Sequence, residues 1–340
     1  MFLGFNFMVP FILTDRIGCK LIYPGELRFY PPATNMERMA SESARRILLL
    51  GCGYVGLATG ARLARAGHSV FGLRRAAEAG DELRAAGLEP LTGDLTRRTD
   101  LDRLPGPFDW VVNTVSSSRG GAAEYRDTYL EGTRTVLAWL ATQRVAKFVY
   151  TSSTSVYAQN DGRVVDESSP AEPAGETGRL LRDTEELLLA AARERAFPAV
   201  ILRVAGIYGP GRGHLFHQFL AGEARLAGDG SRLMNMIHRD DVASAIVAAL
   251  ENGRPGEIYN CADDEPVSQR DFLAWLAAQL GRPPPPPATD AENAARKRGL
   301  THKRVNNWKL HALGWTPQYP SFRDGYAAAV AAARSDATES

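Results

Sequence analysis

The sequence predicts an α/β fold built on a doubly wound parallel sheet. Strand-like apolar runs alternate with helical patterns over most of the 340 residues, which is typical of a parallel sheet with crossover helices. The first of these runs leads directly into a Gly-rich turn and an amphipathic helix, an order that is common at the start of such folds. With 44% hydrophobic residues, the chain can bury a large core.

The first strand is expected at residues 47–50, where four consecutive apolar residues suit a strand covered on both faces. The sequence GCGYVG follows and matches the pattern G-x-G-x-x-G. Its first glycine permits a tight turn, the second lets a pyrophosphate approach the backbone, and the third lets the next helix pack closely, with free N–H groups facing the phosphates. The pattern therefore predicts a Rossmann-type dinucleotide site, the alternative being a Gly-rich turn in an ordinary doubly wound fold. The residues assigned to this site are Gly51, Gly53, Tyr54, Val55 and Gly56.

The end of the second strand, expected at residues 69–73, narrows the choice of cofactor. An acidic side chain is expected there, about twenty residues past the glycines, when the ribose hydroxyls of NAD are bound. This chain instead has Arg74 and Arg75, and its next carboxylate is Glu78. Guanidinium groups suit a 2′-phosphate through charge-assisted hydrogen bonds. The sequence therefore favours NADP over NAD, although two solvated arginines at a strand end are the alternative interpretation.

Further strands and helices continue the alternation. Strands are expected at residues 88–91, 108–115, 147–152 and 198–205, and helices at 124–143 and 177–195. Ligands of such sheets lie at the carboxyl ends of the strands, so polar residues at those ends are candidates for the site. The residues expected to surround one cleft are Asp94, Asn113, Thr114, Ser152, Ser153 and Ala205.

Charge and cysteine content disfavour several classes of protein. Lys and Arg number 40 against 39 Asp and Glu, so the net charge of +1 predicts no general attraction to nucleic acid. Three widely spaced cysteines favour a reducing compartment, which makes the cytoplasm the expected location. No apolar run approaches the roughly twenty residues that cross a membrane. No metal site is predicted, because His214, His217 and His238 lack a completing set of Cys or carboxylate ligands.

Residues 1–45 differ from the rest of the chain, because they show no sustained period and are rich in Phe and Pro. A proline and two charged residues interrupt the apolar stretch that a secretory signal would need. We expect natural translation to start at Met36 or Met39, which would make the leader a misplaced start or a disordered tail.

Several spaced segments resemble one known family. YTSSTSVY at residues 150–157 resembles the Ser-Ser-x-x-Val-Tyr segment of the extended short-chain dehydrogenases, which are nucleotide-sugar epimerases and dehydratases. Other matches follow in the same order and together cover about residues 46 to 330. These are Gly93-Asp94-Leu95, Arg203 with Ile207-Tyr208-Gly209-Pro210-Gly211, Ile237-His238-Arg239-Asp240-Asp241-Val242-Ala243, and Tyr259-Asn260-Cys261-Ala262-Asp263-Asp264.

The resemblance implies roles for individual residues. Asp94 and Leu95 should hold the adenine, Thr114 and Val115 the ribose side, and Ser153 should polarise a carbonyl or hydroxyl of the substrate. The segments after the sixth strand border the substrate cleft, although His238 suits packing at a lobe junction better than chemistry. The substrate residues implied are Arg203, Tyr208, Asn235 and His238.

The resemblance also implies the domain organisation. A dinucleotide-binding domain is expected at residues 46–210, and a smaller C-terminal substrate lobe at 211–334 is interleaved with it. A small-molecule substrate and a homodimer are expected, because family members pair through two of their helices. The run RPPPPP at residues 282–287 predicts an extended surface segment. The basic run KRVNN at residues 303–307 suits either a phosphorylated substrate or a solvated patch.

The chain departs from the family pattern where Tyr-x-x-x-Lys is expected. Thr177 or Gly178 stands in place of the Tyr, and Leu181 or Arg182 in place of the Lys. That Lys normally lowers the pKa of the Tyr, so that the pair supplies general acid–base catalysis worth roughly 10² to 10⁴ in rate. This departure resembles an atypical branch of the superfamily.

Two hypotheses about function therefore stay open. In the first, the chain is an NADP-dependent oxidoreductase in which Ser153 donates a hydrogen bond, while Tyr157, Arg179 or Arg182 supplies the proton or anchors a phosphate. In the second, it binds NADP without turnover and acts as a redox sensor or partner-binding module.

Overall fold

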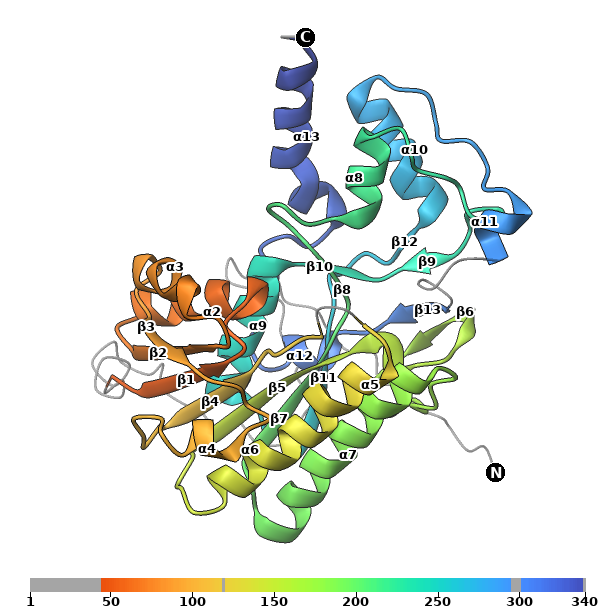
Figure 1. Cartoon of the computed structure of the whole chain (residues 1–340). Coiled ribbons are helices and arrows are strands. Elements are labelled where there is room, and N and C mark those ends of the chain that lie inside the picture. The colour runs from red at the N-terminus through yellow and green to blue at the C-terminus, as the bar shows by residue number, and fades with distance from the viewer. Residues whose placement is uncertain (1–43, 118–119, 295–300, 339–340) are drawn as a thin grey trace, which may run out of the picture. The chain divides into compact units, whose positions relative to one another are not determined.

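Seven parallel strands form the central sheet of the protein, in the order β11-β7-β5-β4-β1-β2-β3 (Figure 1). This computed structural model describes residues 44–117, 120–294 and 301–338. Residues 1–43 of the predicted leader therefore lie outside the described residues. The order contains the 3-2-1-4-5 arrangement of doubly wound dinucleotide-binding folds, which confirms the predicted α/β class. The strands are β1 (Arg46–Leu50), β2 (Ser69–Arg74), β3 (Glu89–Thr92), β4 (Trp110–Asn113), β5 (Lys147–Ser153), β7 (Ala199–Val204) and β11 (Glu257–Cys261).

All six predicted strands are present, within a few residues of their expected bounds, and β11 adds a seventh at the edge next to β7. The helices that cover the sheet include α2 (Tyr54–Arg65), α7 (Glu176–Arg195) and α9 (Arg239–Asn252). The predicted helix over residues 124–143 is present as an uninterrupted helical run over residues 122–140, but it contains a π-helical turn that was not predicted. That segment consists of α5 (Ala122–Tyr125), a π-helical turn η2 (Arg126–Glu131) and α6 (Gly132–Leu140).

Alternate residues of β1 point to opposite faces of the sheet, as the period of two in a strand requires. Ile47 and Leu49 pack into the core cluster that includes residues of α2 and α9, whereas Leu48 and Leu50 pack into the cluster that includes residues of α6 and α7. All four side chains are fully buried. Helices on both faces therefore explain the continuous apolar run of the first strand (Figure 1).

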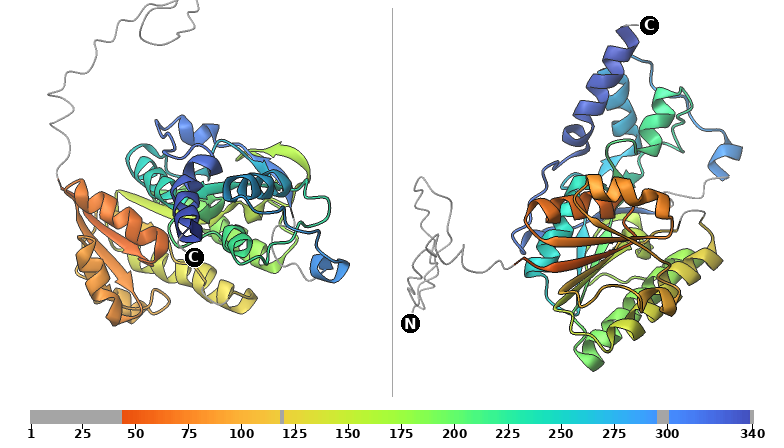
Figure 2. Two further views of the ribbon diagram at one scale, coloured as in Figure 1. Left: turned by 90° about the horizontal axis from the view of Figure 1, so that it is seen from above. Right: turned by 60° about the vertical axis from the view of Figure 1, so that its left-hand side comes forward.

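A separate aromatic core holds the C-terminal lobe together. It joins α8 (His214–Leu220), α10 (Gln269–Leu280) and α13 (Phe322–Thr338) through Phe216, Phe272 and other apolar side chains. These three helices lie together beyond the sheet (Figure 2). The lobe and the sheet are interleaved along the chain, because α9 and β11 follow α8 in sequence yet pack in the central sheet layers.

Short strand pairs connect the lobe to the sheet. β8 (Gly206–Tyr208) pairs with β10 (Met236–His238), β9 (Leu233–Met234) with β12 (Val267–Ser268), and β6 (Asn160–Val165) with β13 (His302–Val305). The remaining helical elements are α3 (Gly80–Ala85), α4 (Arg98–Leu101), α11 (Asp290–Ala294), α12 (Trp308–His311) and the 3₁₀ turns η1 (Ala77–Ala79) and η3 (Thr154–Val156). Within the described ranges, no helix has the length and apolar character needed to cross a membrane.

Candidate cofactor and active site

The Gly-rich turn between β1 and α2 has the geometry that its glycines allow. Gly51 has a φ of +76°, and a Cβ added there would lie 2.6 Å from the Cα of Val115. A Cβ on Gly56 would lie 2.8 Å from the Oγ1 of Thr114. No side chain of the described residues caps α2, so its first N–H groups remain available to an anion. The turn therefore fits the diphosphate of a dinucleotide.

A cleft of about 790 Å³ opens where β1 to β4 end. Seven of the residues predicted to bind the cofactor line it, whereas Tyr54, Val55 and Gly56 belong to the adjoining helix. Thr114 does not line the cleft. Its buried hydroxyl instead donates a hydrogen bond to the Gly51 carbonyl at 2.9 Å and so stabilises the turn. The lining residues among those predicted are Gly51, Gly53, Arg74, Arg75, Asp94, Leu95 and Val115.

The two arginines at the end of β2 have different surroundings. Arg74 donates to the carbonyl of Cys52 and pairs with Glu82 of α3 at 2.6 Å, so its guanidinium braces the Gly-rich turn. Arg75 is exposed, lines the cleft and pairs with no carboxylate in the described part of the chain. Of the two guanidinium groups, that of Arg75 is therefore the one better placed to meet a ligand in the cleft. The spacing of residues in the sequence did not identify Glu82 as the partner of Arg74, because Glu82 lies on a helix beyond the strand.

Ser153 ends β5, next to β4 and β7 in the sheet. Its Oγ accepts a hydrogen bond from the backbone N–H of Ser155 at 3.1 Å, so the side chain caps the 3₁₀ turn η3. The residue is half-buried, and its hydroxyl proton is directed to no acceptor in the described residues. A hydroxyl in this position can donate to an oxygen of a ligand bound at the carboxyl edge of the sheet.

The start of α7 occupies the place where the missing Tyr and Lys would lie. Gly178 is buried against Pro173, and a Cβ there would lie 2.6 Å from the Cβ of that proline, so position 178 leaves no room for a tyrosine. Leu181 is buried in the core. Arg182 pairs with Asp183 at 2.8 Å, and Arg179 donates to the carbonyl of Ala174. Neither arginine makes a contact with the Ser153 segment among the described interactions.

A buried polar network lies beneath the other strand ends, and three of the predicted site residues belong to it, namely Ser152, Tyr157 and Arg203. Arg203 of β7 donates to both carboxylate oxygens of Glu185 on α7, with a closest distance of 2.7 Å. The hydroxyl of Tyr157 accepts from Arg203 at 2.8 Å and donates to Asn260 at 2.9 Å. Ser152 donates to Glu185 at 2.5 Å.

Because Tyr157 is 0% exposed and Arg203 only 5% exposed, neither side chain reaches a substrate. Burial also raises the pKa of the Tyr157 hydroxyl, although Arg203 opposes that effect, and the hydroxyl proton is donated to Asn260 within the network. Ser152 likewise faces the network rather than the cofactor cleft. Glu185 was not among the predicted site residues, although a carboxylate on the buried face of α7 requires a partner of opposite charge.

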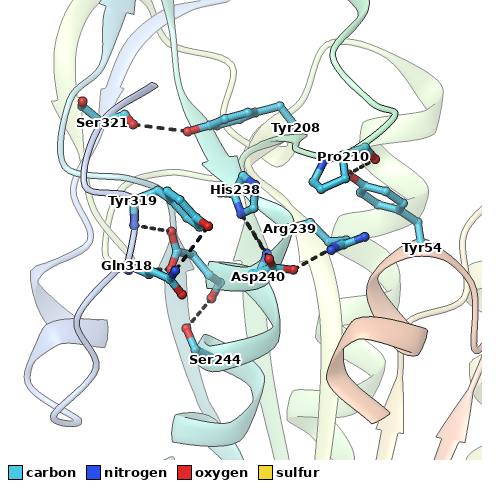
Figure 3. Close-up of polar contacts among 11 residues, drawn as sticks. Tyr54, Tyr208, Pro210, His238, Arg239, Asp240, Ser244, Gln318, Tyr319 and Ser321 are labelled. Carbon is cyan, nitrogen blue, oxygen red and sulfur yellow. Dashed lines mark hydrogen bonds and ion pairs between the residues drawn. The ribbon is translucent and has the colours of Figure 1, made fainter. Parts of the chain in front are cut away.

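The other three predicted substrate residues join the lobe to the sheet, and Figure 3 shows two of them, Tyr208 and His238. The Tyr208 ring stacks on Tyr326 with 4.4 Å between ring centres, and its hydroxyl donates to the Ser321 carbonyl at 3.3 Å. His238 accepts from the backbone N–H of Asp240 at 3.2 Å and caps α9, and burial lowers its pKa. His238 therefore packs at the lobe junction.

Asn235 binds the backbone of β13 through both ends of its side-chain amide. It donates to the Lys303 carbonyl at 3.1 Å and accepts from the Val305 N–H at 2.8 Å. These contacts position the lobe strand, so Asn235, Tyr208 and His238 all serve the junction in this conformation.

Two tyrosines beside α7 were not predicted as site residues. Tyr125 and Tyr129 pack together with 4.8 Å between ring centres, and both contact the core cluster that includes Leu181. The Tyr129 hydroxyl accepts from the N–H of Ser117 at 3.1 Å. Tyr125 is half-buried, and no hydrogen bond to its hydroxyl is present in the described residues. No motif in the sequence distinguishes Tyr125 from an ordinary core aromatic.

Together, the parallel sheet, the uncapped helix after the Gly-rich turn and the strand-end cleft define a Rossmann-type dinucleotide-binding protein. The chain belongs to the NAD dependent epimerase/dehydratase family, whose model matches residues 47–262. This match confirms the resemblance that the sequence motifs indicated.

The names of proteins similar to this chain do not agree on one activity. The protein YeeZ of Escherichia coli (strain K12) is 29% identical over an alignment of 287 residues that covers 81% of this chain and 97% of YeeZ. The 4-hydroxy-2-methyl-3-oxo-4-farnesyl-3,4-dihydroquinoline-1-oxide ketoreductase of Stigmatella aurantiaca is 30% identical over 68% of this chain and 72% of its own length. The crystal structure of DesIV, a dTDP-glucose 4,6-dehydratase from Streptomyces venezuelae with NAD and TYD bound, is 25% identical with a TM-score of 0.73, covering 86% of this chain and 98% of DesIV.

Proposed function

We propose that this protein is an NADP-preferring oxidoreductase that acts on a carbonyl or hydroxyl carbon of a small or nucleotide-sugar-like substrate. The observation that carries the proposal is the cleft at the ends of β1 to β4, with the exposed Arg75 on its wall and Ser153 at the end of the neighbouring strand. The likeness to a ketoreductase and to an NAD-bound dehydratase supports the same class of chemistry.

The residues of the chain have separable tasks in this proposal. The N–H groups at the start of α2 and the Gly-rich turn bind the diphosphate, and Arg75 meets the 2′-phosphate. A bound nicotinamide supplies or accepts the hydride. Ser153 donates a hydrogen bond to the substrate oxygen, which stabilises the charge that develops there. The half-buried Tyr125 is the hydroxyl that we assign to proton transfer in place of the absent tyrosine.

A second candidate function is binding of NADP without turnover, as a sensor or partner-binding module. One observation favours it: the buried Leu181 occupies a position of the missing lysine, so no cation there assists a proton donor. Both functions require the cofactor cleft, and they differ in the use of Ser153 and Tyr125.

Titration of the purified chain with NADPH and NADH, followed through nicotinamide fluorescence, tests the cofactor site. Oxidation of NADPH is then measured against a panel of nucleotide-sugar and small carbonyl substrates. For an oxidoreductase, Ser153→Ala should lower turnover about 10²-fold or more, the scale of a lost transition-state donor, without changing the Kd for NADPH. Tight binding with no turnover on any substrate would favour the sensor, and tighter binding of NADH would refute the NADP preference.

A further inference from the structure

Two arginines from the C-terminal half of the chain converge on the first residue of α2. The guanidinium carbons of Arg212 and Arg239 each lie 5.2 Å from the centre of the Tyr54 ring. Arg212 belongs to the loop between β8 and α8, and Arg239 is the first residue of α9. Tyr54 follows the Gly-rich turn directly, so both cations lie beside the helix end whose N–H groups suit phosphate oxygens.

The loop that carries Arg212 is fixed against Tyr54 (Figure 3). Gly209 and Arg212 close a turn by two backbone hydrogen bonds, of 3.1 and 2.9 Å. The Tyr54 hydroxyl donates to the carbonyl of Pro210 within that turn, at 3.1 Å. A Cβ on Gly209 would lie 3.0 Å from both the Tyr54 hydroxyl and the Nε2 of His238. This close packing fixes the backbone of the turn. It therefore also fixes the position of the Arg212 Cα, from which the side chain extends.

The charges in this cluster do not balance. Arg212 pairs with no carboxylate among the residues that the structure describes. Arg239 donates to Asp240 at 2.8 Å through its Nε, and both of its terminal nitrogens remain able to donate elsewhere. Two guanidinium groups thus face one carboxylate beside a helix N-terminus that itself carries partial positive charge. Such an excess of donors suits a ligand with at least two negative charges.

We propose that Arg212 and Arg239 form an anion subsite for the diphosphate of the dinucleotide cofactor. The inference rests on the proposed function, because it assigns these two residues to the same cofactor. The N–H groups of α2 would bind one side of the diphosphate, and the guanidinium groups would add charge-assisted hydrogen bonds from the lobe side. The lobe would then contribute directly to cofactor affinity, and a bound cofactor would hold the loop between β8 and α8 in place.

Fluorescence titrations of the full chain with NADPH and NADH test this assignment without measuring turnover. Arg212→Gln and Arg239→Gln should each raise the Kd for both cofactors about tenfold, the effect of one lost charge-assisted hydrogen bond. Arg254→Gln is the matched control, because Arg254 is an exposed arginine just beyond the opposite end of α9. Its Kd values should equal those of the wild type. Equal thermal unfolding temperatures would show that the variants are folded.

The diphosphate can be distinguished from the 2′-phosphate in the same assay. Arg75→Gln should weaken NADPH binding alone, whereas the two lobe variants should weaken NADPH and NADH equally. Inorganic pyrophosphate should displace NADPH from the wild type at a lower concentration than from Arg212→Gln. Kd values within twofold of the wild type, or weakening of NADPH only, would overturn the inference. Failure of the wild type to bind either cofactor would overturn the proposed function, and the inference with it.

Discussion

The carboxyl edge of the central sheet has two halves that use similar residues for different purposes. Where β1 to β4 end, Arg75, Asp94 and the Gly-rich turn line a cleft of about 790 Å³. Where β5, β7 and β11 end, Ser152, Arg203 and the neighbouring polar groups bind one another beneath α7. Polar side chains thus face an open cleft in the first half, whereas in the second half they are buried and bind one another. The two halves differ in whether a helix covers the strand ends, and not in the types of residue found there.

The largest expected effect comes from breaking the buried half. Arg203→Met removes the partner of Glu185, whose carboxylate would then be buried without its cation. We expect a loss of about 3–5 kcal/mol in the free energy of unfolding, measured by urea denaturation. Arg182→Met is the matched control, because the pair between Arg182 and Asp183 is about half-exposed and should contribute about 0–1 kcal/mol.

Equal losses for Arg203→Met and Arg182→Met would contradict the division of the strand ends into a buried and an open half. The double variant Arg203→Met with Glu185→Leu sharpens the test. It removes both charges and should recover part of the stability, because an apolar pair of similar volume often replaces a buried ion pair without loss.

Two adjacent serines provide a smaller contrast within one strand. Ser152 donates to the Glu185 carboxylate at 2.5 Å in the buried network, whereas Ser153 only caps a 3₁₀ turn. Ser152→Ala should lower the free energy of unfolding by about 1.5–3 kcal/mol, the range for hydrogen bonds to charged groups. Ser153→Ala should cost less than about 1 kcal/mol. If Ser153→Ala were the more destabilising of the two, Ser153 would be a structural residue and its proposed donor role would lose support.

Most of the sheet could be predicted from the sequence because its signals are local. The apolar run of β1, the glycines after it and the alternation of strands and helices each depend on a few neighbouring residues. The π-helical turn η2 could not be predicted, because its side chains follow the same helical spacing as α6. The strand β11 was matched only as a motif, since its pairing with β7 is a contact between distant segments.

The candidate site divides in the same way. Gly51, Gly53 and Arg75 could be predicted to lie together because their place depends on position along one strand and turn, and all three line the cleft. Arg203 and Tyr157 were misassigned because burial depends on α7, which lies elsewhere in the sequence and brings Glu185 to them. The cluster around Tyr54 was missed for the same reason, because Arg212 and Arg239 follow Tyr54 by more than 150 residues. Residue type alone does not show such pairings.

The buried half also contains the carboxyl group of Asp263, and the dependence of stability on pH should show its effect. Asp263 follows β11, is 1% exposed, and has no hydrogen-bond partner for either carboxylate oxygen among the described residues. Burial raises the pKa of Asp263 to about 9, with smaller contributions from the nearby carboxylates of Asp264, Glu265 and Asp241, although the backbone N–H of Glu265 opposes the rise.

Because that pKa is higher in the folded than in the unfolded chain, the folded state holds more protons between about pH 4 and pH 9. The contribution of Asp263 to stability is therefore largest in acid and falls as pH rises through this range, by at most about 1.4 kcal/mol per pH unit. Urea denaturation at several pH values between about 5 and 8 measures the slope. Asp263→Asn cannot ionise and should show a shallower decline, while the exposed Asp290→Asn controls for the amide substitution. Parallel slopes for the wild type and Asp263→Asn would mean that Asp263 ionises with equal ease in both states, and that a polar group at this strand end is solvated after all.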